Sequence, residues 1–565
     1  MLATMMDRPL TVAGLFAHGR TVHRDSVVTT IDVDLGQPIT RTFAETADRV
    51  DRLAATLRDL NVGRGDRVAT LQANTASHLE CYLAIPAMGA VLHTLNCRLS
   101  ADQLVHCINE AGDSVIIVDA TYLNLLDDVL SYAPSVTTVL VTGRGASAAS
   151  TLAAATQVTA LTFESAIAQP REPISYPADL DELECAGICH SSGTTGDPKG
   201  VAYSHRSTWL HALTATTANA SGIGYRDVVM PIVPMFHANA WGYPYAAWLA
   251  GADLAFPGPD LSAPALAAFI AHARPTISAG VPVVWSDLLR WGENHDLDLS
   301  SFRMLLCGGS AVPEQLMRDY EERHGLRIVQ GWGMTETSPV AAVTHPPKTV
   351  VPGSAEEWMY RLSAGRILFG VEARIVADDG QILPSDGVHV GELEVRGPWV
   401  TGSYLGGQSP EKFEDGWLRT GDVGALSPDG YIRLTDRAKD VIKSGGEWIS
   451  SVELENHLAG HPAVDDAVVI GVGDDRWGER PLACVVLREG AESTASDLRA
   501  FLTDRVPRWW LPERWAFTDA VPRTSVGKYD KVKLRADLAA GRISPQYVAA
   551  EARPSVQPHE ETAEP

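Results

Sequence analysis

The chain has 565 residues, 45% of them hydrophobic, and a formal net charge of −24. At about 150 residues per domain, this length predicts roughly three to four domain-sized units, each with a sizeable core. The acidic charge repels phosphate backbones and anionic membrane surfaces, so it excludes nucleic-acid binding through bulk electrostatics. A locally positive pocket for a small anionic ligand remains compatible with this composition.

Two segments bear on location. Met1–Arg20 carries charged residues and no long apolar core, so it lacks the features of a signal peptide and a cytoplasmic location is expected. Val228–Ala252 has no Asp, Glu, Lys or Arg over 25 residues, which is long enough to span a bilayer. Pro231 and Pro234 would leave backbone groups unsatisfied in lipid. We therefore interpret this stretch as buried strand, loop and helix, and expect no integral membrane segment.

Strand-like and helix-like runs alternate through the first two thirds of the chain. Predicted strands are Arg67–Leu71, Val115–Val118, Val136–Val141, Thr276–Ala279, Met304–Cys307 and Arg327–Gln330. Predicted helices are Ala76–Met88, Ala101–Ala111, Tyr122–Leu130, Val283–Trp291 and Pro313–His324. Between them, Gly143–Thr159 is rich in Ala, Ser, Thr and Gly and is interpreted as a surface excursion. The alternation predicts layered α/β subdomains.

The pattern changes at about Ser363. Short β-rich segments at Ala373–Val376, Gly391–Val395 and Tyr431–Leu434 are separated by Asp-Gly turn signals, which predicts a mainly antiparallel subdomain. After about residue 440 a small α+β unit follows, with helices at Val452–Ala459 and Ala495–Arg505 and strands at Val464–Val472 and Leu482–Leu487. The last segment is acidic, contains Pro and has few apolar residues, so it is predicted to be disordered.

The most informative motif is the segment from His190 to Gly200, with the sequence HSSGTTGDPKG. It follows an apolar run and combines hydroxyl groups, glycines and Lys199. Glycines let backbone N–H groups approach an anion, and hydroxyls and a lysine add donors and charge, so the loop suits a triphosphate. It is not a Walker A loop, because Pro198 and Gly200 occupy the positions of the second glycine and the magnesium-binding hydroxyl.

Four further segments follow it along the chain. They are Gln330–Pro339 (QGWGMTETSP), Trp417–Asp422 (WLRTGD), Asp436–Ile449 (DRAKDVIKSGGEWI) and Pro522–Lys528 (PRTSVGK). In the first of these, Trp332 offers a flat face for a base, Thr335 a phosphate donor, and Glu336 an oxygen ligand for Mg²⁺. Asp422 could accept hydrogen bonds from two ribose hydroxyls.

In this order and spacing, from about residue 10 to residue 540, the five segments resemble the acyl-adenylate-forming, AMP-binding superfamily. Two stretches, Pro234–Gly242 (PMFHANAWG) and Lys443–Ser451 (KSGGEWISS), are most similar to medium- and long-chain fatty-acyl-CoA synthetases. The resemblance implies an N-terminal AMP-binding domain at 1–436, a hinge at 437–442, a small mobile C-terminal domain at 443–545 and a disordered acidic tail at 546–565.

The resemblance also implies roles for individual residues. The residues implied to hold the nucleotide are Ser191, Ser192, Gly193, Thr194, Thr195 and Lys199 at the β- and γ-phosphates, Gly309, Gln330, Gly331 and Trp332 at the adenine, Thr335 at a phosphate, and Asp422 and Arg437 at the ribose. Ser191 and Glu336 would organise Mg²⁺, and Lys528 would bridge the acid carboxylate and the α-phosphate.

The same resemblance covers the acyl site and the hinge. His237 matches a residue that lines the acyl-carboxylate site, next to Ala238, and Trp241 matches an aromatic gate to the chain tunnel. Lys439 matches the hinge residue. Lys443 and Trp448 lie in a segment that contacts nucleotide or CoA after the hinge turns.

The expected activity is ATP-dependent conversion of a medium- or long-chain fatty acid to acyl-AMP and then to acyl-CoA. The expected catalytic residues are Lys528, Glu336 and His237. The expected ligands are a small carboxylic acid, ATP, CoA and Mg²⁺. A homodimer is a further expectation from similar members. Two alternatives stay open: an aryl or other non-fatty acid, or nitrite activated for diazotisation, with or without CoA; and a catalytically silent acyl-nucleotide-binding regulator.

Three residues depart from the family's pattern. His190 stands where an aromatic residue is common, Asp197 adds a negative charge inside the phosphate loop, and Ile367 replaces a usual proline. We hypothesise that His190 tunes the site or its substrate.

Overall fold

The structure is a computed structural model that describes residues 4–32, 36–143, 146–155, 158–191, 197–444, 447–524 and 528–548. By its internal contacts the chain divides into two units. The first holds Met1–Ala438 together with Arg523–Lys528, and the second holds Lys439–Pro522 and Tyr529–Pro565. The chain therefore passes from the first unit to the second between Ala438 and Lys439, inside the segment predicted as a hinge.

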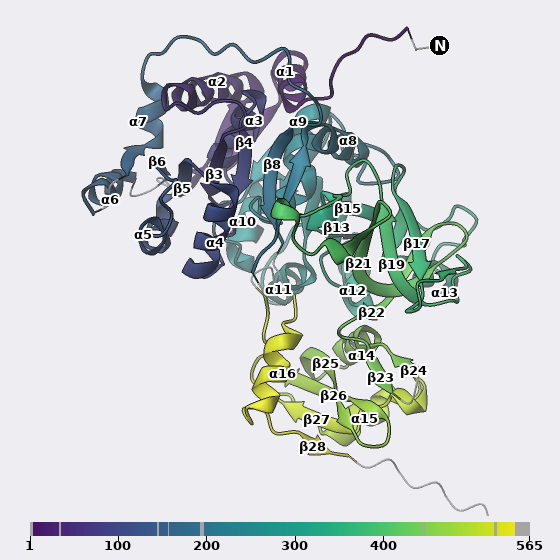
Figure 1. The fold of residues 1–565 in the computed structure, drawn as a ribbon. Coiled ribbons are helices and arrows are strands. Elements are labelled where there is room, and N and C mark those ends of the chain that lie inside the picture. The colour runs from purple at the N-terminus through teal and green to yellow at the C-terminus, as the bar shows by residue number, and fades with distance from the viewer. Residues whose placement is uncertain are drawn as a thin grey trace, which may run out of the picture. The chain divides into compact units, whose positions relative to one another are not determined.

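The first unit contains a mostly parallel sheet in the order β7, β6, β5, β3, β4, β8, β9 (Figure 1). Its strands are β3 (Arg67–Leu71), β4 (Val91–Thr94), β5 (Val115–Asp119), β6 (Thr138–Thr142), β7 (Thr159–Thr162), β8 (Cys185–His190) and β9 (Gly200–Ser204). The helices along it are α2 (Phe43–Asp59), α3 (Ala76–Ala87), α4 (Ala101–Ala111), α5 (Leu123–Leu130), α6 (Ala149–Ala155) and α7 (Phe163–Ala168). Successive side chains of a strand point to opposite faces. Accordingly, Ile117 packs into the core that contains α2 and α3, and Ile116 into the core that contains α4 and α5.

A second, larger sheet runs through the rest of this unit in the order β18, β17, β19, β21, β22, β16, β15, β14, β13, β12, β10, β11, β1, β2. Its α/β half comprises β1 (Val27–Asp32), β2 (Gln37–Thr42), β10 (Val228–Pro231), β11 (Asp253–Phe256), β12 (Ile277–Gly280), β13 (Met304–Gly308), β14 (Ile328–Gly333) and β15 (Val340–Val343). The remaining helices of the unit up to this point are α1 (Val12–Val22), α8 (His205–Ala215), α9 (Tyr243–Ala250), α10 (Ala263–Ala273), α11 (Pro282–Gly292) and α12 (Glu314–His324), of which α8 contacts β8 and β9 of the first sheet.

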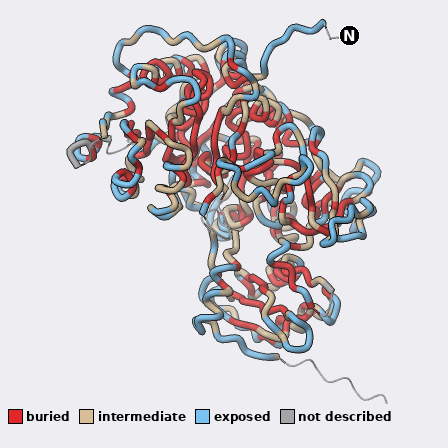
Figure 2. Tube along the Cα trace, viewed as in Figure 1, coloured by how far each residue is buried: buried red, intermediate tan, exposed pale blue. Residues whose placement is uncertain are grey.

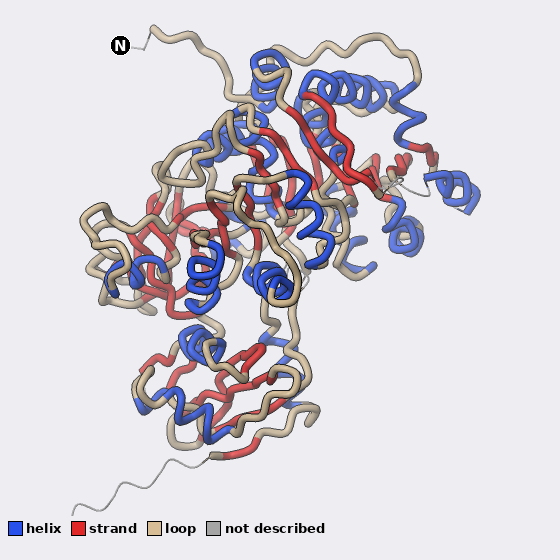
Figure 3. Tube along the Cα trace, turned by 180° about the vertical axis from the view of Figure 1, so that it is seen from behind, coloured by secondary structure: helices blue, strands red, loops and turns tan. Residues whose placement is uncertain are grey.

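One hydrophobic core joins the two sheets. It includes Tyr82 of α3, Trp248 of α9 and inward side chains of strands from both sheets, such as Leu92 and Leu306. Buried residues, red in Figure 2, gather in the middle of the unit, and Figure 3 shows its strands and helices from behind. Burial on this scale holds the strand ends that carry the site in fixed positions.

The antiparallel half of the second sheet was predicted from its Asp-Gly turns, and the structure confirms it. Its elements are α13 (Ala355–Arg361), β16 (Gly365–Ile367), β17 (Glu372–Val376), β18 (Ile382–Leu383), β19 (Gly391–Arg396), β20 (Phe413–Glu414), β21 (Trp417–Leu426) and β22 (Tyr431–Arg437). The register places Asp422 of β21 directly opposite Arg437 of β22.

The second unit is a small α+β sheet structure in the order β24, β23, β26, β27, β28, with β25 also paired to β26. Its elements are β23 (Ile442–Ser444), β24 (Glu447–Ile449), α14 (Ser451–Ala459), β25 (Val464–Asp474), β26 (Gly478–Leu487), α15 (Ala495–Leu502), β27 (Arg514–Phe517), α16 (Lys531–Ala539) and β28 (Gln546–Tyr547). Strands β26 and β27, joined through α15, pair in parallel; the predicted elements did not include β27.

Three sequence-based expectations can be compared with these elements: the first agrees with the structure and the other two change. Val228–Ala252 forms strand β10, the short helical turn η3 (Ala238–Gly242) and helix α9, as expected for a buried stretch. The Gly143–Thr159 excursion contains helix α6, because alanine has the highest helix propensity. The tail expected from residue 546 begins inside strand β28, because Gln546 and Tyr547 pair with β27; its residues from 549 onward lie outside the described residues. Among the helices that the structure describes, none is long and apolar enough to cross a membrane.

Candidate active site

The two ends of the predicted phosphate loop are fixed by an antiparallel strand pair. His190, the last residue of β8, is opposite Gly200, the first residue of β9. Beyond this pair, the Ser191 N–H donates to the Lys199 carbonyl oxygen at 2.9 Å. The Lys199 N–H in turn donates to the Ser191 hydroxyl at 3.4 Å. The loop thus starts from a closed hairpin neck; the predicted phosphate ligands Ser192, Gly193, Thr194 and Thr195 lie outside the described residues.

Glu336 lies in a short helical turn, η4 (Thr335–Thr337), directly after strand β14 and is 4% exposed. The Tyr404 hydroxyl donates a hydrogen bond to its Oε1. The Tyr203 hydroxyl donates to the Thr335 carbonyl oxygen at 2.6 Å. Because Tyr203 lies in β9, the strand that leaves the phosphate loop is tied directly to the turn that carries Glu336.

Tyr404 also faces the lysine of the phosphate loop. The Lys199 ammonium lies 5.4 Å from the centroid of the Tyr404 ring, within range of a cation–π interaction, and donates to the Ser409 hydroxyl. Burial and the charge of Glu336 raise the pKa of Tyr404, which keeps its hydroxyl protonated as a donor. Tyr404 therefore connects Lys199 and Glu336. Tyr404 could not be predicted as a site residue, because a lone tyrosine in such a sequence carries no chemical signal of its own.

Asp422 joins the predicted adenine and ribose residues. One of its carboxylate oxygens lies 2.9 Å from Nε of Arg437, and the other accepts a hydrogen bond from the Trp332 indole N–H at 2.8 Å. Asp422 is 5% exposed, so both interactions form in a largely dry environment. The cross-strand register between β21 and β22 and the end of β14 thus bring three predicted residues together.

Close backbone approach explains the glycines at the ends of β13 and β14. Gly308 pairs with Gly331, and a Cβ on Gly308 would collide with the Gly331 carbonyl oxygen. Gly309 has a φ of +83°, which favours glycine. The Gln330 side chain turns away to the backbone: its Oε1 accepts from the Val312 N–H at 2.8 Å, and its Nε2 donates to carbonyl oxygens of residues 362 and 363. Gln330 therefore contributes to the predicted adenine wall indirectly, by hydrogen-bonding the backbone of residues 312, 362 and 363.

The acyl-site segment is an unusual left-handed turn. Ala238, Asn239, Ala240 and Trp241 have φ values between +44° and +57°, a conformation that costs free energy for non-glycine residues. The Asn239 carboxamide oxygen accepts from the Cys189 thiol at 3.1 Å and from a buried tyrosine hydroxyl. These buried contacts hold the turn in place.

The residues on either side of that turn are also fixed. Asn74 donates to the Pro231 and Val233 carbonyl oxygens, each at 2.9 Å, and accepts from the Met235 N–H at 2.7 Å. Past the turn, the Trp241 ring lies 3.2 Å from the position that a Cβ on Gly308 would occupy. Trp241 therefore packs on the end of β13, beside the predicted adenine wall.

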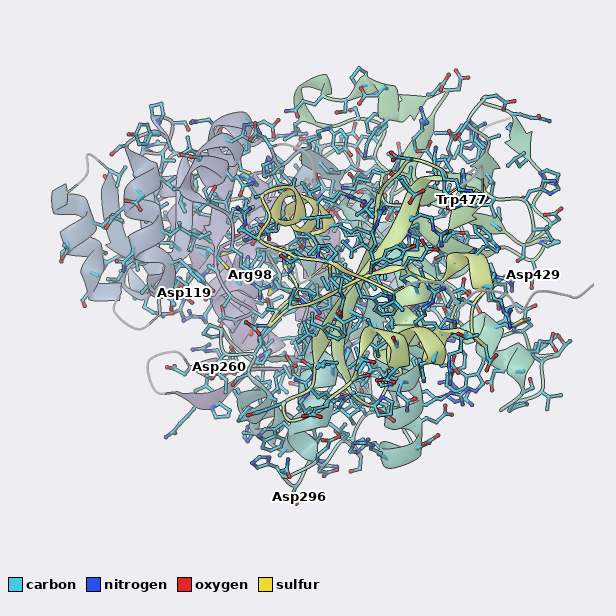
Figure 4. The ribbon with its side chains drawn as sticks, turned by 90° about the horizontal axis from the view of Figure 1, so that it is seen from below. Arg98, Asp119, Asp260, Asp296, Asp429 and Trp477 are labelled. Atoms are coloured by element: carbon cyan, nitrogen blue, oxygen red, sulfur yellow. The ribbon has the colours of Figure 1, made fainter. Side chains whose placement is uncertain are left out.

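His237 precedes the left-handed turn. Burial lowers its pKa to about 3, with smaller contributions from the nearby charges of Lys528 and Arg98, so its imidazole is neutral at physiological pH. Arg98, labelled in Figure 4, follows strand β4, and its guanidinium lies 5.9 Å from the centroid of the Phe236 ring. A neutral imidazole beside two cations suits a carboxylate-binding position.

Lys528 belongs by its contacts to the first unit, although most of its sequence neighbours belong to the second. The Thr524 N–H donates to the Lys528 carbonyl oxygen at 2.7 Å and closes the segment. Burial and the charge of Arg437 lower the pKa of Lys528 to about 8, whereas Asp422 and Glu336 act in the opposite direction. Its Cε lies 3.9 Å from the position of a Cβ on Gly309. Lys528 therefore stands among the predicted nucleotide residues of the first unit.

Three predicted residues belong to the second unit. Lys439 begins it, and Lys443 and Trp448 are opposite each other in the β23–β24 hairpin, with the ammonium 5.8 Å from the indole centroid. Contacts of Lys443 and Trp448 with nucleotide or CoA remain a prediction from the sequence.

A chain of hydrogen bonds runs from the interior to the neck of the phosphate loop. Asp113 Oδ2 lies 2.8 Å from His93 Nδ1, His93 Nε2 lies 3.0 Å from His190 Nδ1, and His190 Nε2 lies 2.8 Å from an oxygen of Glu110. We call these four side chains the histidine bridge. Of its members, only His190 was predicted from the sequence, because a polar residue inside an apolar strand, such as His93, carries no sign of its partner.

The protons of the histidine bridge can be counted. Its three hydrogen bonds need three hydrogens, and two neutral imidazoles supply two. Burial raises the pKa of Asp113 although His93 opposes it, and burial lowers the pKa of His190 to about 4. The third hydrogen therefore lies in the buried contact between Asp113 and His93, and the other two donors point outward toward Glu110. Partial burial opposes ionisation of Glu110, but the hydrogen bond from His190 lowers its pKa, which keeps it anionic.

The comparisons with known proteins place this fold and site in a family. Residues 17–405 match the family model described as AMP-binding enzyme, and residues 453–528 match that of the AMP-binding enzyme C-terminal domain. The chain belongs to the AMP-binding enzyme family.

Full-length relatives are named CoA ligases. The chain is 40% identical over 538 residues to the 3-methylmercaptopropionyl-CoA ligase of Ruegeria pomeroyi, covering 95% of this chain and 98% of that protein. It is 38% identical to the medium-chain-fatty-acid–CoA ligase of Ectopseudomonas oleovorans, covering 95% and 97%. It is 39% identical to the long-chain-fatty-acid–CoA ligase of Thermus thermophilus, covering 94% and 96%.

Solved structures share the fold. An anthranilate CoA ligase in complex with anthranoyl-AMP superposes with a TM-score of 0.84 at 25% identity, covering 96% of this chain and all (100%) of that one. ATP-bound MatB from Rhodopseudomonas palustris gives a TM-score of 0.77 at 25% identity, covering 93% and 98%. These comparisons confirm the predicted fold, a large α/β N-terminal domain with a small C-terminal domain, and the predicted class of enzyme, an AMP-forming acid–CoA ligase.

Proposed function

We propose that the chain uses ATP to activate an aliphatic carboxylic acid as acyl-AMP, releasing pyrophosphate, and then transfers the acyl group to CoA. The observation that carries this proposal is the position of Lys528, among Gly309, Arg437, Asp422 and Glu336. A lysine near the C-terminal end of a chain is usually a solvated surface group. Here it lies within the electrostatic reach of groups expected to hold the ribose and the metal.

In the first step, a carboxylate oxygen attacks the α-phosphorus while the bond to the β-phosphate oxygen breaks. Two anions must approach, and the Lys528 ammonium, placed between them, offsets their repulsion and stabilises the charge of the transition state. The neutral His237 imidazole can hydrogen-bond the acid carboxylate without adding negative charge. Asp422 and Arg437 hold the ribose so that the α-phosphorus is oriented for in-line attack.

Mg²⁺ fits the oxygen donors at the phosphate end. Glu336 offers a buried carboxylate and Ser191 a hydroxyl, and Mg²⁺ typically takes one or two such protein ligands together with substrate phosphates. Among the described residues, no group of three or more His, Cys, Asp or Glu gathers as a self-contained metal cage, which agrees with that mode. When bound, the ion would neutralise charge on the β- and γ-phosphates.

In the second step, the CoA thiolate attacks the carbonyl carbon of acyl-AMP and AMP leaves. One site must then exchange the Lys528 contact for a path to the thiol. We propose that the chain turns at Lys439, within the hinge 437–442, so that Lys443 and Trp448 take part in the second step. In this proposal the two domains on either side of the hinge comprise residues 1–436 and 443–545.

The proposed acid is a medium- or long-chain fatty acid, and a short thioether acid is the nearest variant. The names of relatives at 38–40% identity over nearly the whole chain support both. Trp241, packed on the end of β13, would limit the length of the acyl chain that the site accepts. An aryl acid or nitrite is a second candidate. The presence of both Glu336 and Lys528 argues against a silent regulator, because loss of either residue would be the mark of an inactive relative. A cytoplasmic location and a homodimer stay predictions.

ATP–pyrophosphate exchange tests the proposal. We expect exchange with aliphatic acids of graded length, including a thioether acid, and thioester formation only when CoA is added. Lys528→Ala should abolish exchange. Exchange with aryl acids or nitrite alone would favour the second candidate, and no exchange with any acid would overturn the catalytic assignment.

A further inference from the structure

The histidine bridge ends on both sides of the phosphate-loop neck. Glu110, in the last turn of α4, accepts a hydrogen bond from His190 on the β8 side, and its carboxylate lies beside Gly200 on the β9 side. The approach is close: a Cβ on Gly200 would lie 3.0 Å from a Glu110 carboxylate oxygen. A single carboxylate thus holds the entry and the exit of the loop at a fixed separation.

The same carboxylate reaches a third segment. The Gln408 amide donates to the other Glu110 oxygen, and next to it Ser409 accepts from the Lys199 ammonium. A Cβ on Gly200 would also collide with the Leu405 side chain. The segment 404–409, which carries Tyr404 against Glu336, is therefore docked onto the loop neck through Glu110.

The inner end of the bridge is rigid. His93 and Asp113 have fully buried side chains (0% exposed), and His93 lies in the central strand β4, next to β8 in the sheet. Burying a carboxyl and two imidazoles is unfavourable unless they form hydrogen bonds. Each of the three forms at least one along the bridge, although Asp113 Oδ1 has no hydrogen-bond partner among the described residues. Apolar side chains at these positions would avoid the cost of burying polar groups. The histidine bridge instead ends at the neck of the phosphate loop, which indicates a role there.

We propose that His190 and Glu110 are positioning residues that fix the neck of the phosphate loop, with Ser191 and Lys199, for binding the β- and γ-phosphates of ATP, and that the buried pair His93 and Asp113 anchors them. The proposal rests on the proposed function, because it assumes that this loop binds the triphosphate. Neither residue needs to touch the reacting atoms. Their contribution is to hold Ser191, Lys199 and the 404–409 segment in one arrangement before ATP arrives.

A positioning role at the phosphate loop predicts different effects on ATP and AMP binding, whereas a purely structural role predicts the same effect on both. ATP has β- and γ-phosphates and AMP lacks them, whereas both have the adenosine and α-phosphate held by Asp422, Arg437 and Trp332. Disturbing the bridge should therefore weaken ATP binding and leave AMP binding unchanged. In kinetics, KM for ATP should rise with little change in kcat.

The experiment is calorimetric titration of the full chain with ATP plus Mg²⁺ and, separately, with AMP. The variants are Glu110→Ala, Glu110→Gln and His190→Phe, with Asp102→Asn as a matched control, because Asp102 is an exposed acid on the same helix. Loss of a hydrogen bond to a charged group predicts about tenfold weaker ATP binding for Glu110→Ala and His190→Phe. Glu110→Gln keeps an oxygen acceptor for His190 and should recover most of the affinity. Thermal unfolding checks that each variant folds.

The outcomes separate the two proposals. Equal losses of ATP and AMP affinity, or no loss of either in Glu110→Ala, would overturn the positioning role and leave the proposed function standing. If His190→Phe does not fold, the two Glu110 variants, at a partly exposed side chain, decide the matter. Failure of the unsubstituted chain to bind either nucleotide would instead contradict the proposed function itself.

Discussion

The carboxylate of Asp422 lies 2.9 Å from Nε of Arg437, directly across the β21–β22 strand pair. The same carboxylate accepts the Trp332 indole N–H at 2.8 Å. One antiparallel register thus assembles residues from three separate motifs into a single corner of the first unit. The proposed ribose site depends on that corner.

Asp422→Ala should raise KM for ATP by about tenfold or more, because it removes a ribose acceptor and leaves Arg437 without its partner across the strands. The measurement is the ATP dependence of pyrophosphate exchange. The control is Glu372→Gln, which breaks another directly opposed acid–arginine pair, Glu372 and Arg396, at an exposed position. Equal effects of the two substitutions would contradict the ribose role.

Lys528 should give adenylation a basic limb in its pH profile. Its pKa is lowered to about 8, so the ammonium is present below that pH and is lost as the pH rises through it. We expect kcat/KM for exchange to fall above about pH 8, since this parameter reports the ionisation of the free enzyme. Lys528→Arg keeps the charge at high pH and should remove that limb even if its rate is lower. An unchanged limb in Lys528→Arg would assign the ionisation to another group.

Tyr404 should matter through Glu336. Tyr404→Phe removes the hydroxyl that donates to the Glu336 carboxylate but keeps the ring beside Lys199. We expect the Mg²⁺ concentration needed for half-maximal exchange to rise roughly tenfold, as for a lost hydrogen bond to a charged acceptor. Tyr320→Phe removes a buried hydroxyl that donates to the Trp285 carbonyl oxygen, away from the site. It should lower stability without any change in Mg²⁺ dependence; the same dependence in both variants would refute the role.

Much of the α/β framework could be predicted from local pattern. Arg67–Leu71 and Ala101–Ala111 are a strand and a helix with the bounds that hydrophobic spacing predicts. Their alternation indicated the layered sheet correctly, because a parallel strand between two helical layers is a short apolar run. The Ala-rich helix α6 was missed because its flanking Ser, Thr and Gly suggested a loop.

The site was predictable only where a motif carried it. The left-handed turn through Ala238 and Trp241 could not be predicted, because non-glycine residues adopt it only when tertiary contacts such as those of Asn239 hold them there. Tyr404 and Glu110 were missed for a related reason. Each acts through a partner hundreds or tens of residues away, and one sequence does not reveal such pairs.

Trp241 should control which acids are accepted. Its ring packs against the end of β13 at Gly308, so Trp241→Ala would open space there. We expect the ratio of kcat/KM for long over short aliphatic acids to rise by about tenfold, the lower end of the effect of one methylene group in a hydrophobic pocket. Trp358→Ala, at a tryptophan stacked between Arg318 and Arg361 on α12 and α13, is the control. An unchanged acid preference in Trp241→Ala would place the acyl chain elsewhere.

The central claim is that the acid attacks the α-phosphorus of ATP. The most direct measurement uses an aliphatic acid labelled with ¹⁸O in its carboxylate, together with ATP, Mg²⁺ and CoA, and mass spectrometry of the products. The account predicts AMP carrying one ¹⁸O atom, because the bridging oxygen of acyl-AMP leaves with the nucleotide when the thiolate attacks. Unlabelled AMP, or ADP with the label in inorganic phosphate, would contradict it.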